Sequence, residues 1–250
     1  MGHGDDIMAT GMAKGAKDRG KRIAFGDGQK IIWGPWSAEV FKNNPNVAPP
    51  GQERAPDIEW IRYHKGHRLY NKQGPGRWIW NYDFRPTPGE FFHLDDSFKD
   101  LGPNLIFVEP NVPNKPCGPN KQWPVDRFKE VADELKDAGF DVVQPEYGAK
   151  NVVARQIRTT SFRQGVQLLR KARLAILPEG GLHHAAAALG IPAIVLFGAW
   201  VPPKVLGYDM HINIADDNPG CGLFIRCQHC VDAMNKISVN FVLDAVERSL

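Results

Sequence analysis

The stretch Leu174–Gly198, LAILPEGGLHHAAAALGIPAIVLFG, contains two apolar runs with an alanine-rich segment between them. Leu174–Leu177 and Ala193–Phe197 have the length and composition of buried strands, and the alanines are typical of a closely packed helix. A strand, a helix and a second strand form the unit of a parallel sheet covered by helices. The polar residues Glu179–His184 directly follow the first strand. They therefore lie at the edge of such a sheet where ligands bind.

The segment Glu179–His184 has the features of a phosphate-binding loop. The start of a helix presents unpaired backbone N–H groups and the positive end of the helix dipole, and both favour a phosphate. Gly180 and Gly181 allow the backbone to approach a ligand closely. The alternative is a tight turn in which a histidine has its partners within the protein and Glu179 caps the helix. The residue types alone support the two interpretations equally.

Strand and helix signals alternate through the rest of the second half. Ser161 is placed to cap a helix, and Gly139 is placed to end one. Further strands are expected at Leu105–Val108 and Asp141–Val143, and helices between Pro124 and Gly139, after Ser161 and over Asn240–Leu250. This alternation predicts an α/β fold with a parallel sheet over residues 102–250.

Residues 1–101 have a different texture, rich in glycine and proline, and Asn43–Pro56 is a loop by composition. Aspartate is a favoured N-cap residue, so Gly4-Asp5-Asp6 is placed to cap a helix that begins at Ile7. Short strands are expected at Arg22–Phe25, Lys30–Trp33 and Glu59–Tyr63. We expect a smaller domain over this half.

The composition is that of an ordinary globular protein, with 42% hydrophobic and 24% charged residues among 250. The net charge of +3 suits an anionic substrate, but lysine and arginine are dispersed, unlike those of nucleic-acid-binding domains. The most apolar run, Ile191–Val201, has about half the length that a transmembrane helix needs. The N-terminus lacks the pattern of a secretion signal. We expect a cytoplasmic protein, either free or at the inner face of the membrane.

Several motifs occur in an order that is specific in combination. They are a Gly-Asp motif in GHGDDIMATG (2–11), then Lys121, Trp123 and Pro124 before a helix with Phe128, TTSFRQGVQLLRKARLAIL (159–177), EGGLHH (179–184), AAALGIP, LFG and a cysteine-containing tail. This ordered set resembles glycosyltransferase family 9, typified by bacterial ADP-heptose:lipopolysaccharide heptosyltransferases. The resemblance covers nearly all of residues 103–250 and the first sixteen residues.

The resemblance implies an α/β fold of two Rossmann-like domains (GT-B type) with a reduced N-terminal domain. Residues 1–101 would form the acceptor side, and residues 102–250 the nucleotide-sugar donor side. The implied activity is inverting transfer of a sugar, heptose by analogy, from a nucleotide-sugar to a hydroxyl of a glycan or glycolipid. An ADP-sugar is the expected donor. No cofactor or metal is required, because lysine, histidine and helix amides can hold a diphosphate.

The family's reacting groups fall on two parts of this sequence. Asp5 falls on the catalytic aspartate, which would take the proton of the acceptor hydroxyl. Lys121 falls on the lysine that contacts the donor phosphates, where a cation offsets the charge of the leaving diphosphate. Asp6 and Asn111 are candidates for acceptor contacts or for supporting the site.

The family's diphosphate loop falls on EGGLHH. Gly181 and His184 match it directly, and the backbone amides of Gly180, Gly181 and Leu182 would lie near the diphosphate. Glu179 replaces the usual aspartate, so a longer side chain carries the same carboxylate. Adjacent helical side chains point about 100° apart, so we expect one of His183 and His184 to face the ligand and the other to pack.

This sequence departs from the family pattern in two places. Family members carry a strand directly before the Gly-Asp motif, whereas only residues 1–3 precede it here. The N-terminal domain is then a trimmed variant, or the sequence lacks its natural start. That departure and Glu179 favour a second hypothesis, a catalytically inactive nucleotide or nucleotide-sugar binding protein. The joint presence of Asp5, Lys121 and His184 favours the enzyme.

Three cysteines near the C-terminus, Cys221, Cys227 and Cys230, raise the question of a structural zinc ion. Structural zinc sites usually contain paired CxxC motifs, and only one such pair is present, so buried or free thiols are the alternative. A fourth ligand would come from Cys117, His211 or His229.

Aromatic and basic residues interleave in the first half: Trp33, Trp36, Trp60, Trp78 and Trp80 among Arg62, Lys65, Arg68, Lys72 and Arg77. We favour the interpretation that tryptophan fills the core of a small domain. The alternative is that the rings stack on sugars or bases while the cations contact phosphates. That alternative would admit a nucleic-acid or protein acceptor, although no nucleic-acid-binding motif is present.

Overall fold

A six-stranded sheet dominates the second half of the computed structural model, which describes residues 2–217 and 219–250. Its strands are β5 (Leu105–Val108), β6 (Asp141–Pro145), β7 (Arg155–Ile157), β8 (Leu174–Pro178), β9 (Ala193–Gly198) and β10 (Ile212–Ala215). Their order across the sheet is β10-β9-β8-β5-β6-β7, and every neighbouring pair is parallel. The predicted α/β fold with a parallel sheet is confirmed.

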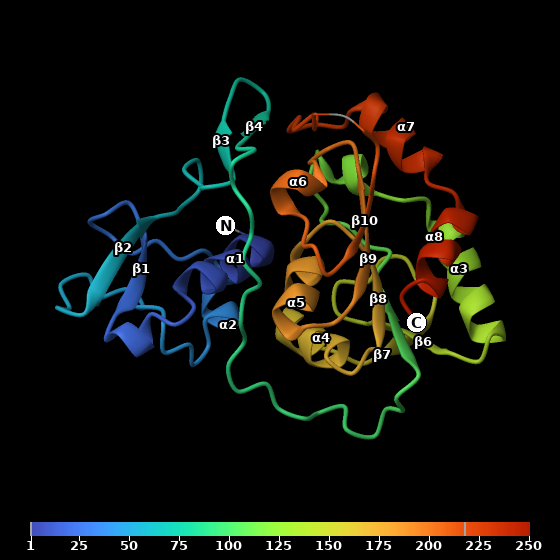
Figure 1. The fold of residues 1–250 in the computed structure, drawn as a ribbon, viewed down its shortest axis with the longest axis horizontal. Coiled ribbons are helices and arrows are strands. Elements are labelled where there is room, and N and C mark those ends of the chain that lie inside the picture. The colour runs from blue at the N-terminus through green and yellow to red at the C-terminus, as the bar shows by residue number, and fades with distance from the viewer. Residues whose placement is uncertain (1, 218) are drawn as a thin grey trace.

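Helices cover both faces of this sheet (Figure 1). They are α3 (Val125–Asp137), α4 (Phe162–Leu169), α5 (Gly181–Leu189), α7 (Gln228–Lys236) and α8 (Val239–Glu247), with the shorter η2 (Gly118–Lys121) and α6 (Pro203–Leu206) between strands. Alternate residues of β5 point to opposite faces. Leu105 and Phe107 join the core cluster of α4 and α5, whereas Ile106 and Val108 join that of α3 and α8. Within the described residues, none of the helices combines the length and apolarity needed to cross a bilayer.

The first half consists of short elements. They are α1 (His3–Ala13), η1 (Lys17–Arg19), β1 (Arg22–Gly26), α2 (Ser37–Val40), β2 (Ile58–Arg62), β3 (Asn71–Gln73) and β4 (Trp78–Trp80). β1 and β2 form a parallel pair, and β3 and β4 form an antiparallel hairpin. Residues 81–104 contain neither helix nor strand and lead the chain back to β5. In Figure 1, α1 lies between the β1–β2 pair and α5 of the main sheet.

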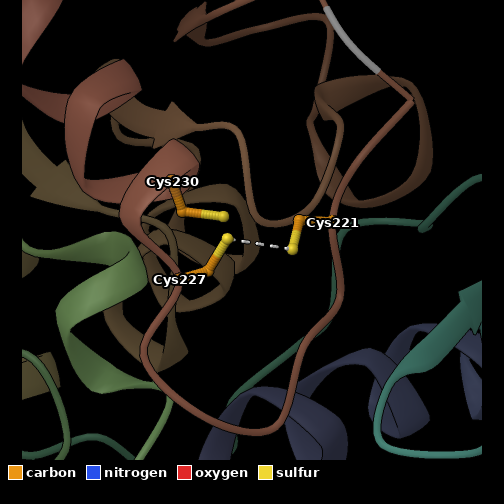
Figure 2. Close-up of side chains that lie close together, drawn as sticks. All are labelled: Cys221, Cys227 and Cys230. Atoms are coloured by element: carbon orange, nitrogen blue, oxygen red, sulfur yellow. Dashed lines mark hydrogen bonds between the residues drawn. The ribbon is translucent and has the colours of Figure 1, made fainter.

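Two of the contacts between the two halves position the site described below. Ile7 and Met8 of α1 belong to the same buried cluster as Ala185 and Ala186 of α5. Further along the chain, the hairpin β3–β4 packs on the loop that precedes α7, because the Trp78 N–H donates to the Gly222 carbonyl at 2.9 Å. This loop ends at α7 beside three cysteine side chains that point toward one another (Figure 2).

Several sequence-based expectations need correction. The helix expected to begin at Ile7 begins at His3, because Gly2 is its N-cap residue and Asp5 lies in the first turn. The strand expected at Lys30–Trp33 is reduced to a single bridge between Ile31 and Gly26. Elements that were not expected are α2, β3, β4, β7, α6, β10 and α7. Most of them are only three or four residues long, too short for a periodic pattern to show.

Candidate functional site

A cavity of about 670 Å³ lies where the carboxyl ends of β5 and β8 meet the N-termini of α1 and α5. Asp5 lines it from α1, and Glu179, Gly181 and His184 line it from the β8–α5 loop. Lys121 contributes from the end of η2. The cavity therefore brings together residues from both halves of the chain, at the edge of the sheet predicted to bind ligands.

His183 organises the loop and does not face the cavity. Its Nδ1 accepts a hydrogen bond from the Gly180 N–H at 3.2 Å, and its Nε2 lies 3.0 Å from the Leu206 carbonyl. A backbone N–H only donates and a carbonyl only accepts, so the imidazole is the neutral tautomer with its proton on Nε2. Burial lowers the pKa of His183. The Gly180 amide is consequently engaged, and Gly181 and Leu182 carry the loop amides that line the cavity.

His184 is the histidine that reaches the cavity, as expected for one member of the pair. Its Nδ1 lies 2.9 Å from the Tyr208 hydroxyl, and its side chain is buried. Burial, with the neighbouring His183 and Lys121 adding to it, lowers the pKa of His184 well below its ordinary value. The ring is therefore neutral near pH 7 and offers a polar nitrogen without a charge.

Lys121 and Glu179 form an ion pair inside the cavity. Glu179 is 4% exposed, and the Lys121 ammonium also lies 4.3 Å from the centre of the Trp200 ring. Glu179, His183 and His184 could in principle hold a metal ion, because their ligand atoms lie within 4.8 Å of one another. However, both nitrogens of His183 already have hydrogen-bond partners and Glu179 is paired, so we do not assign a metal to this group.

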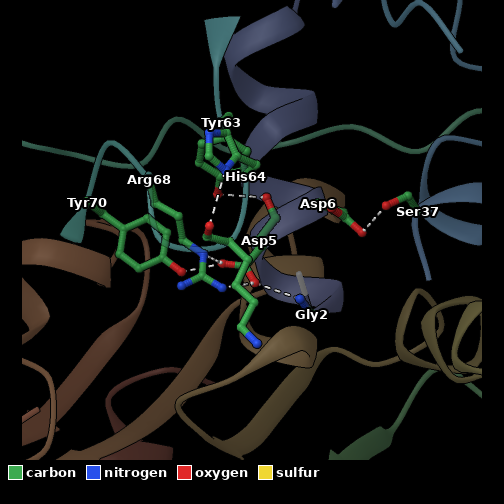
Figure 3. A network of polar contacts seen from close by, with 9 residues as sticks. Gly2, Asp5, Asp6, Ser37, Tyr63, His64, Arg68 and Tyr70 are labelled. Carbon is green, nitrogen blue, oxygen red and sulfur yellow. Dashed lines mark hydrogen bonds and ion pairs between the residues drawn. The ribbon is translucent and has the colours of Figure 1, made fainter. Parts of the chain in front are cut away.

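Asp5 is held by donors from three directions (Figure 3). Its Oδ2 accepts from the Gly2 N–H at 2.6 Å, and its Oδ1 accepts from the Tyr70 hydroxyl. The Arg68 guanidinium forms an ion pair with Oδ1 at 2.9 Å. Arg68 is itself placed 4.9 Å from the centre of the Trp78 ring on the hairpin. The carboxylate is thus fixed in orientation by residues some sixty positions away in the sequence.

The sequence model of glycosyltransferase family 9 (heptosyltransferase) matches residues 112–236, which is half of the 250 residues. The chain belongs to this family. The match contains Lys121, the whole loop Glu179–His184 and the three cysteines. Asp5 and the hairpin lie outside it.

Relatives of this family-9 chain include two curated proteins. It is 29% identical over 106 residues to lipopolysaccharide heptosyltransferase 2 of Escherichia coli (strain K12), and the match covers 36% of this chain and 30% of that protein. It is 27% identical over 160 residues to lipopolysaccharide heptosyltransferase 2 of Salmonella typhimurium, which covers 57% of this chain and 44% of that protein. The chain thus spans less than half the length of either relative. A family 9 glycosyl transferase from Veillonella parvula has the same fold, with a TM-score of 0.62 at 15% identity over 100% of this chain and 94% of that one.

Asp6 and Asn111 occupy different places in the family-9 chain. Asn111 lines the cavity, whereas Asp6 is fully buried on the far side of α1 and accepts a hydrogen bond from the Ser37 hydroxyl at 2.9 Å. Burial raises the pKa of Asp6 to about 7. Asp6 therefore does not contact a ligand in the cavity, and its role is to link α1 to α2.

Glu109 is a cavity residue that the sequence analysis missed. It follows β5 as Glu179 follows β8, and its N–H donates to the Ile176 carbonyl of β8 at 3.1 Å. One carboxylate oxygen accepts from both the backbone and the side-chain nitrogen of Asn111, each at 2.7 Å. Burial raises the pKa of Glu109 to about 7, against these two hydrogen bonds. The signal was available, because a polar residue directly after a buried strand marks the ligand edge of the sheet.

Tyr70, just before β3, was also missed as a site residue, and no local pattern identifies it. Arg68 and Trp78 were named only in the interleaved aromatic and basic residues, for which a ligand-binding role was the less favoured interpretation. The two interpretations offered for the interleaved aromatic and basic residues apply to different rings. Trp80 is 7% exposed and packs against Trp200 at 5.5 Å between ring centres, so it is mainly a core residue although it also lines the cavity. Trp36 is 41% exposed and lines the cavity together with Trp78.

The cysteine cluster is separate from the cavity residues described above. The sulfur atoms of Cys221 and Cys227 lie 3.6 Å apart, and those of all three cysteines lie within 4.8 Å of one another (Figure 2). Within the described residues, this group of metal-ligating atoms contains neither Cys117 nor a histidine, so the structure does not bring the suggested fourth ligands Cys117, His211 and His229 into the cluster. Cys117 lines the cavity instead.

Proposed function

We propose that this family-9 chain is an inverting glycosyltransferase that moves a sugar from a nucleotide-sugar to an acceptor hydroxyl. Residues 1–101 would serve as a reduced acceptor-side domain and residues 102–250 as a Rossmann-like donor domain, in a GT-B arrangement. One observation carries the proposal: a single cavity is lined by Asp5 and also by Lys121 and the β8–α5 loop. A base and a diphosphate site in one cavity are what sugar transfer requires.

The donor diphosphate would bind between Lys121 and the start of α5. The ammonium has three N–H donors, so it can keep its contact with Glu179 and still donate to a phosphate oxygen. The amides of Gly181 and Leu182 and the positive end of the helix dipole add favourable interactions with an anion. His184 would donate or accept one hydrogen bond without changing the charge of the site. Together these groups offset the charge that develops on the leaving diphosphate without a metal ion or another cofactor.

In the proposed reaction, the acceptor oxygen attacks the anomeric carbon of the donor sugar from the side opposite the diphosphate. The new carbon–oxygen bond forms as the bond to the phosphate oxygen breaks, and that electron pair leaves with the diphosphate. Asp5 takes the proton of the attacking hydroxyl. Because Arg68 and Tyr70 both donate to the Asp5 carboxylate, one of these contacts must yield when the acceptor hydroxyl arrives. A single displacement of this kind inverts the anomeric centre.

The family and the two relatives make heptose the first sugar to test, with an ADP-linked donor as the first nucleotide-sugar. A glycan or glycolipid is the acceptor class that we propose. Trp36 and Trp78 line the cavity, and exposed aromatic rings stack well on sugar rings. Arg68 would favour an acceptor with negative charge near the reacting hydroxyl.

A second candidate, a nucleotide-sugar binding protein without turnover, is favoured by one observation. Both oxygens of Asp5 already accept hydrogen bonds, as in a residue that serves to hold α1 to the segment of Arg68 and Tyr70 within the first half. The two candidates differ in what Asp5 does. They share the donor site, so nucleotide binding alone does not distinguish them.

The deciding experiment compares wild type with Asp5→Asn. We expect ADP-heptose turnover, measured as ADP release with and without a lipopolysaccharide-core acceptor, to fall by at least about 100-fold in the variant. ADP affinity, measured by calorimetry, should remain unchanged. Asp126→Asn, on the exposed side of α3, is the matched control and should keep full turnover.

Each outcome is decisive. Undiminished turnover in Asp5→Asn would eliminate Asp5 as the base. Tight ADP binding with no turnover of any nucleotide-sugar, even by the wild type, would support the binding protein. A product with the same anomeric configuration as the donor, determined by NMR, would contradict the inverting mechanism.

A further inference from the structure

The three thiols of Cys221, Cys227 and Cys230 converge although they come from two separate segments. Cys221 lies in the loop before α7, Cys227 is the N-cap residue of that helix, and Cys230 lies in its first turn. In Figure 2 the sulfur atoms point toward one another and not toward the surrounding ribbon. Cys230 is buried, whereas Cys221 and Cys227 are half-buried.

The spacing of the sulfur atoms matches metal coordination better than a disulfide. Sulfur ligands about 2.3 Å from a tetrahedral zinc ion lie about 3.8 Å from one another. The Cys221–Cys227 sulfur distance is 3.6 Å, and the other pairs lie within 4.8 Å. A disulfide bond is much shorter, at about 2.05 Å. A third thiol at the same distance would also have no role in a disulfide.

The surroundings of the cluster favour thiolates at its helical members. A helix N-terminus stabilises negative charge, and both Cys227 and Cys230 lie there. Three thiols held together in this way repel one another when ionised, and a bound cation would remove that repulsion.

We propose that Cys221, Cys227 and Cys230 form a binding site for one thiophilic transition-metal ion, of the Zn²⁺ or Fe²⁺ class. Each sulfur binds as a thiolate, and the proton it loses goes to solvent. Because Cys221 and Cys227 are partly accessible, a water molecule can supply the fourth ligand. The ion is structural and lies outside the chemistry of sugar transfer, so the proposal does not depend on the proposed function.

The metal ion would hold in place the loop before α7, on which the hairpin β3–β4 packs. Within this loop, the Gly222 carbonyl accepts from the Trp78 N–H at 2.9 Å, and the Leu223 carbonyl accepts from Trp200 Nε1 at 2.8 Å. Phe224 lines the cavity and packs against Trp78 at 5.0 Å between ring centres. Asn120 fastens the same loop to η2, accepting from the Cys227 N–H at 2.7 Å. Loss of the ion would therefore loosen the hairpin, whose Trp78 packs against the Arg68 guanidinium that contacts Asp5.

The first test measures metal content and thiol state in the whole chain. Protein purified without chelator is analysed by plasma mass spectrometry, and the chelator-treated protein is titrated with Zn²⁺. We expect about one ion per chain in the wild type, and near zero in Cys227→Ser and Cys230→Ser. Cys117→Ser removes a thiol outside the cluster and should keep the ion.

A second measurement covers variants that fail to fold. Chelator-treated wild type is loaded with Co²⁺, and a thiolate-to-cobalt charge-transfer band should appear and then vanish when Zn²⁺ is added. The melting temperature should rise as Zn²⁺ binds. Absence of both the band and zinc binding would overturn the proposal. So would a disulfide between Cys221 and Cys227 in the metal-free native protein, seen in the intact mass, or loss of the ion in Cys117→Ser to the same extent as in Cys227→Ser.

Discussion

The two halves of the chain reach the same cavity by different means. In residues 102–250, each site residue stands at the end of a regular element: Glu109 after β5, Lys121 at the end of η2, and Glu179 after β8. In the first half, Asp5 stands at the start of a helix, but Arg68 and Tyr70 lie in irregular backbone before a three-residue strand. The second half therefore builds its wall from the sheet, and the first half builds its wall from side-chain contacts between segments far apart in the sequence.

This difference indicates where each half tolerates change. A parallel sheet buried on both faces holds its loops in place through its own core. The cavity wall formed by the second half should therefore form without help from the first half. The position of Asp5 depends on close packing of α1 against α5. A Cβ atom added at Gly4 would lie 2.8 Å from His184 Cδ2, and one added at Gly181 would lie 3.2 Å from the His3 Cβ. Gly181 thus makes room for α1 and not only for a ligand, which revises the role expected of it.

The largest effect should come from a substitution in the cavity wall formed by the second half, where we propose that the donor binds. Lys121→Ala should weaken ADP binding by about 10- to 100-fold, because a hydrogen bond to a charged group contributes about 1.5–3 kcal/mol. Calorimetric titration with ADP measures the change, and Lys129→Ala on the exposed side of α3 is the control. Should Asp5→Asn weaken ADP binding as much as Lys121→Ala does, the assignment of nucleotide binding to the second half would be wrong.

A smaller effect is expected from the contact between the halves. Gly4→Ala should destabilise the protein by about 2 kcal/mol, because the added methyl group overlaps the buried His184 ring. Gly180→Ala is the matched control, since its added Cβ would meet its nearest neighbour, the Pro178 carbonyl, at 4.0 Å and the residue is extended. Urea denaturation compares the two. Equal stabilities of the two variants would show that α1 and α5 are less tightly packed than described.

The smallest expected effect depends on pH and concerns Glu109, in the cavity wall formed by the second half. The pKa of Glu109 is raised to about 7, so the folded protein is most stable when the Glu109 carboxyl is protonated. Its contribution to stability is fully present below the unfolded pKa and is lost as the pH rises through about 7. Glu109→Gln keeps the hydrogen-bond acceptor for Asn111 without the charge. Between pH 5 and pH 8, the free energy of unfolding of this variant should fall by about 1–2 kcal/mol less than that of the wild type. Urea denaturation at both pH values measures this difference. An equal fall in the free energy of unfolding for the variant and the wild type would contradict the prediction.

The sequence predicted the second half better than the first for a physical reason. Buried parallel strands read as continuous apolar runs, and Leu105–Val108 or Ala193–Phe197 could be located without any tertiary information. Edge strands such as β7 and β10 are less apolar and were not found. In the first half, most strands and helices have three to five residues, and their conformation follows from what they pack against.

The candidate site divides in the same way. Asp5, Lys121 and the loop Glu179–His184 were named from motifs, and all of them except His183 line the cavity. Asp6 was included because it is adjacent to Asp5, but successive helical positions face different directions, and its side chain turns toward Ser37. Arg68 and Tyr70 carry no motif, since any loop can contain an arginine and a tyrosine.

By itself, the sequence determined the central strands β5, β6, β8 and β9, the helices α3, α4, α5 and α8, and the polar loop at the sheet edge, because periodicity and helix signals depend on neighbours along the chain. Tertiary structure alone decided that Asp5 meets Arg68 across 63 positions, that His183 turns inward while His184 reaches the cavity, and that three cysteines share one point. Contacts between residues far apart in sequence depend on how whole elements pack, and that packing leaves no periodic trace in either segment.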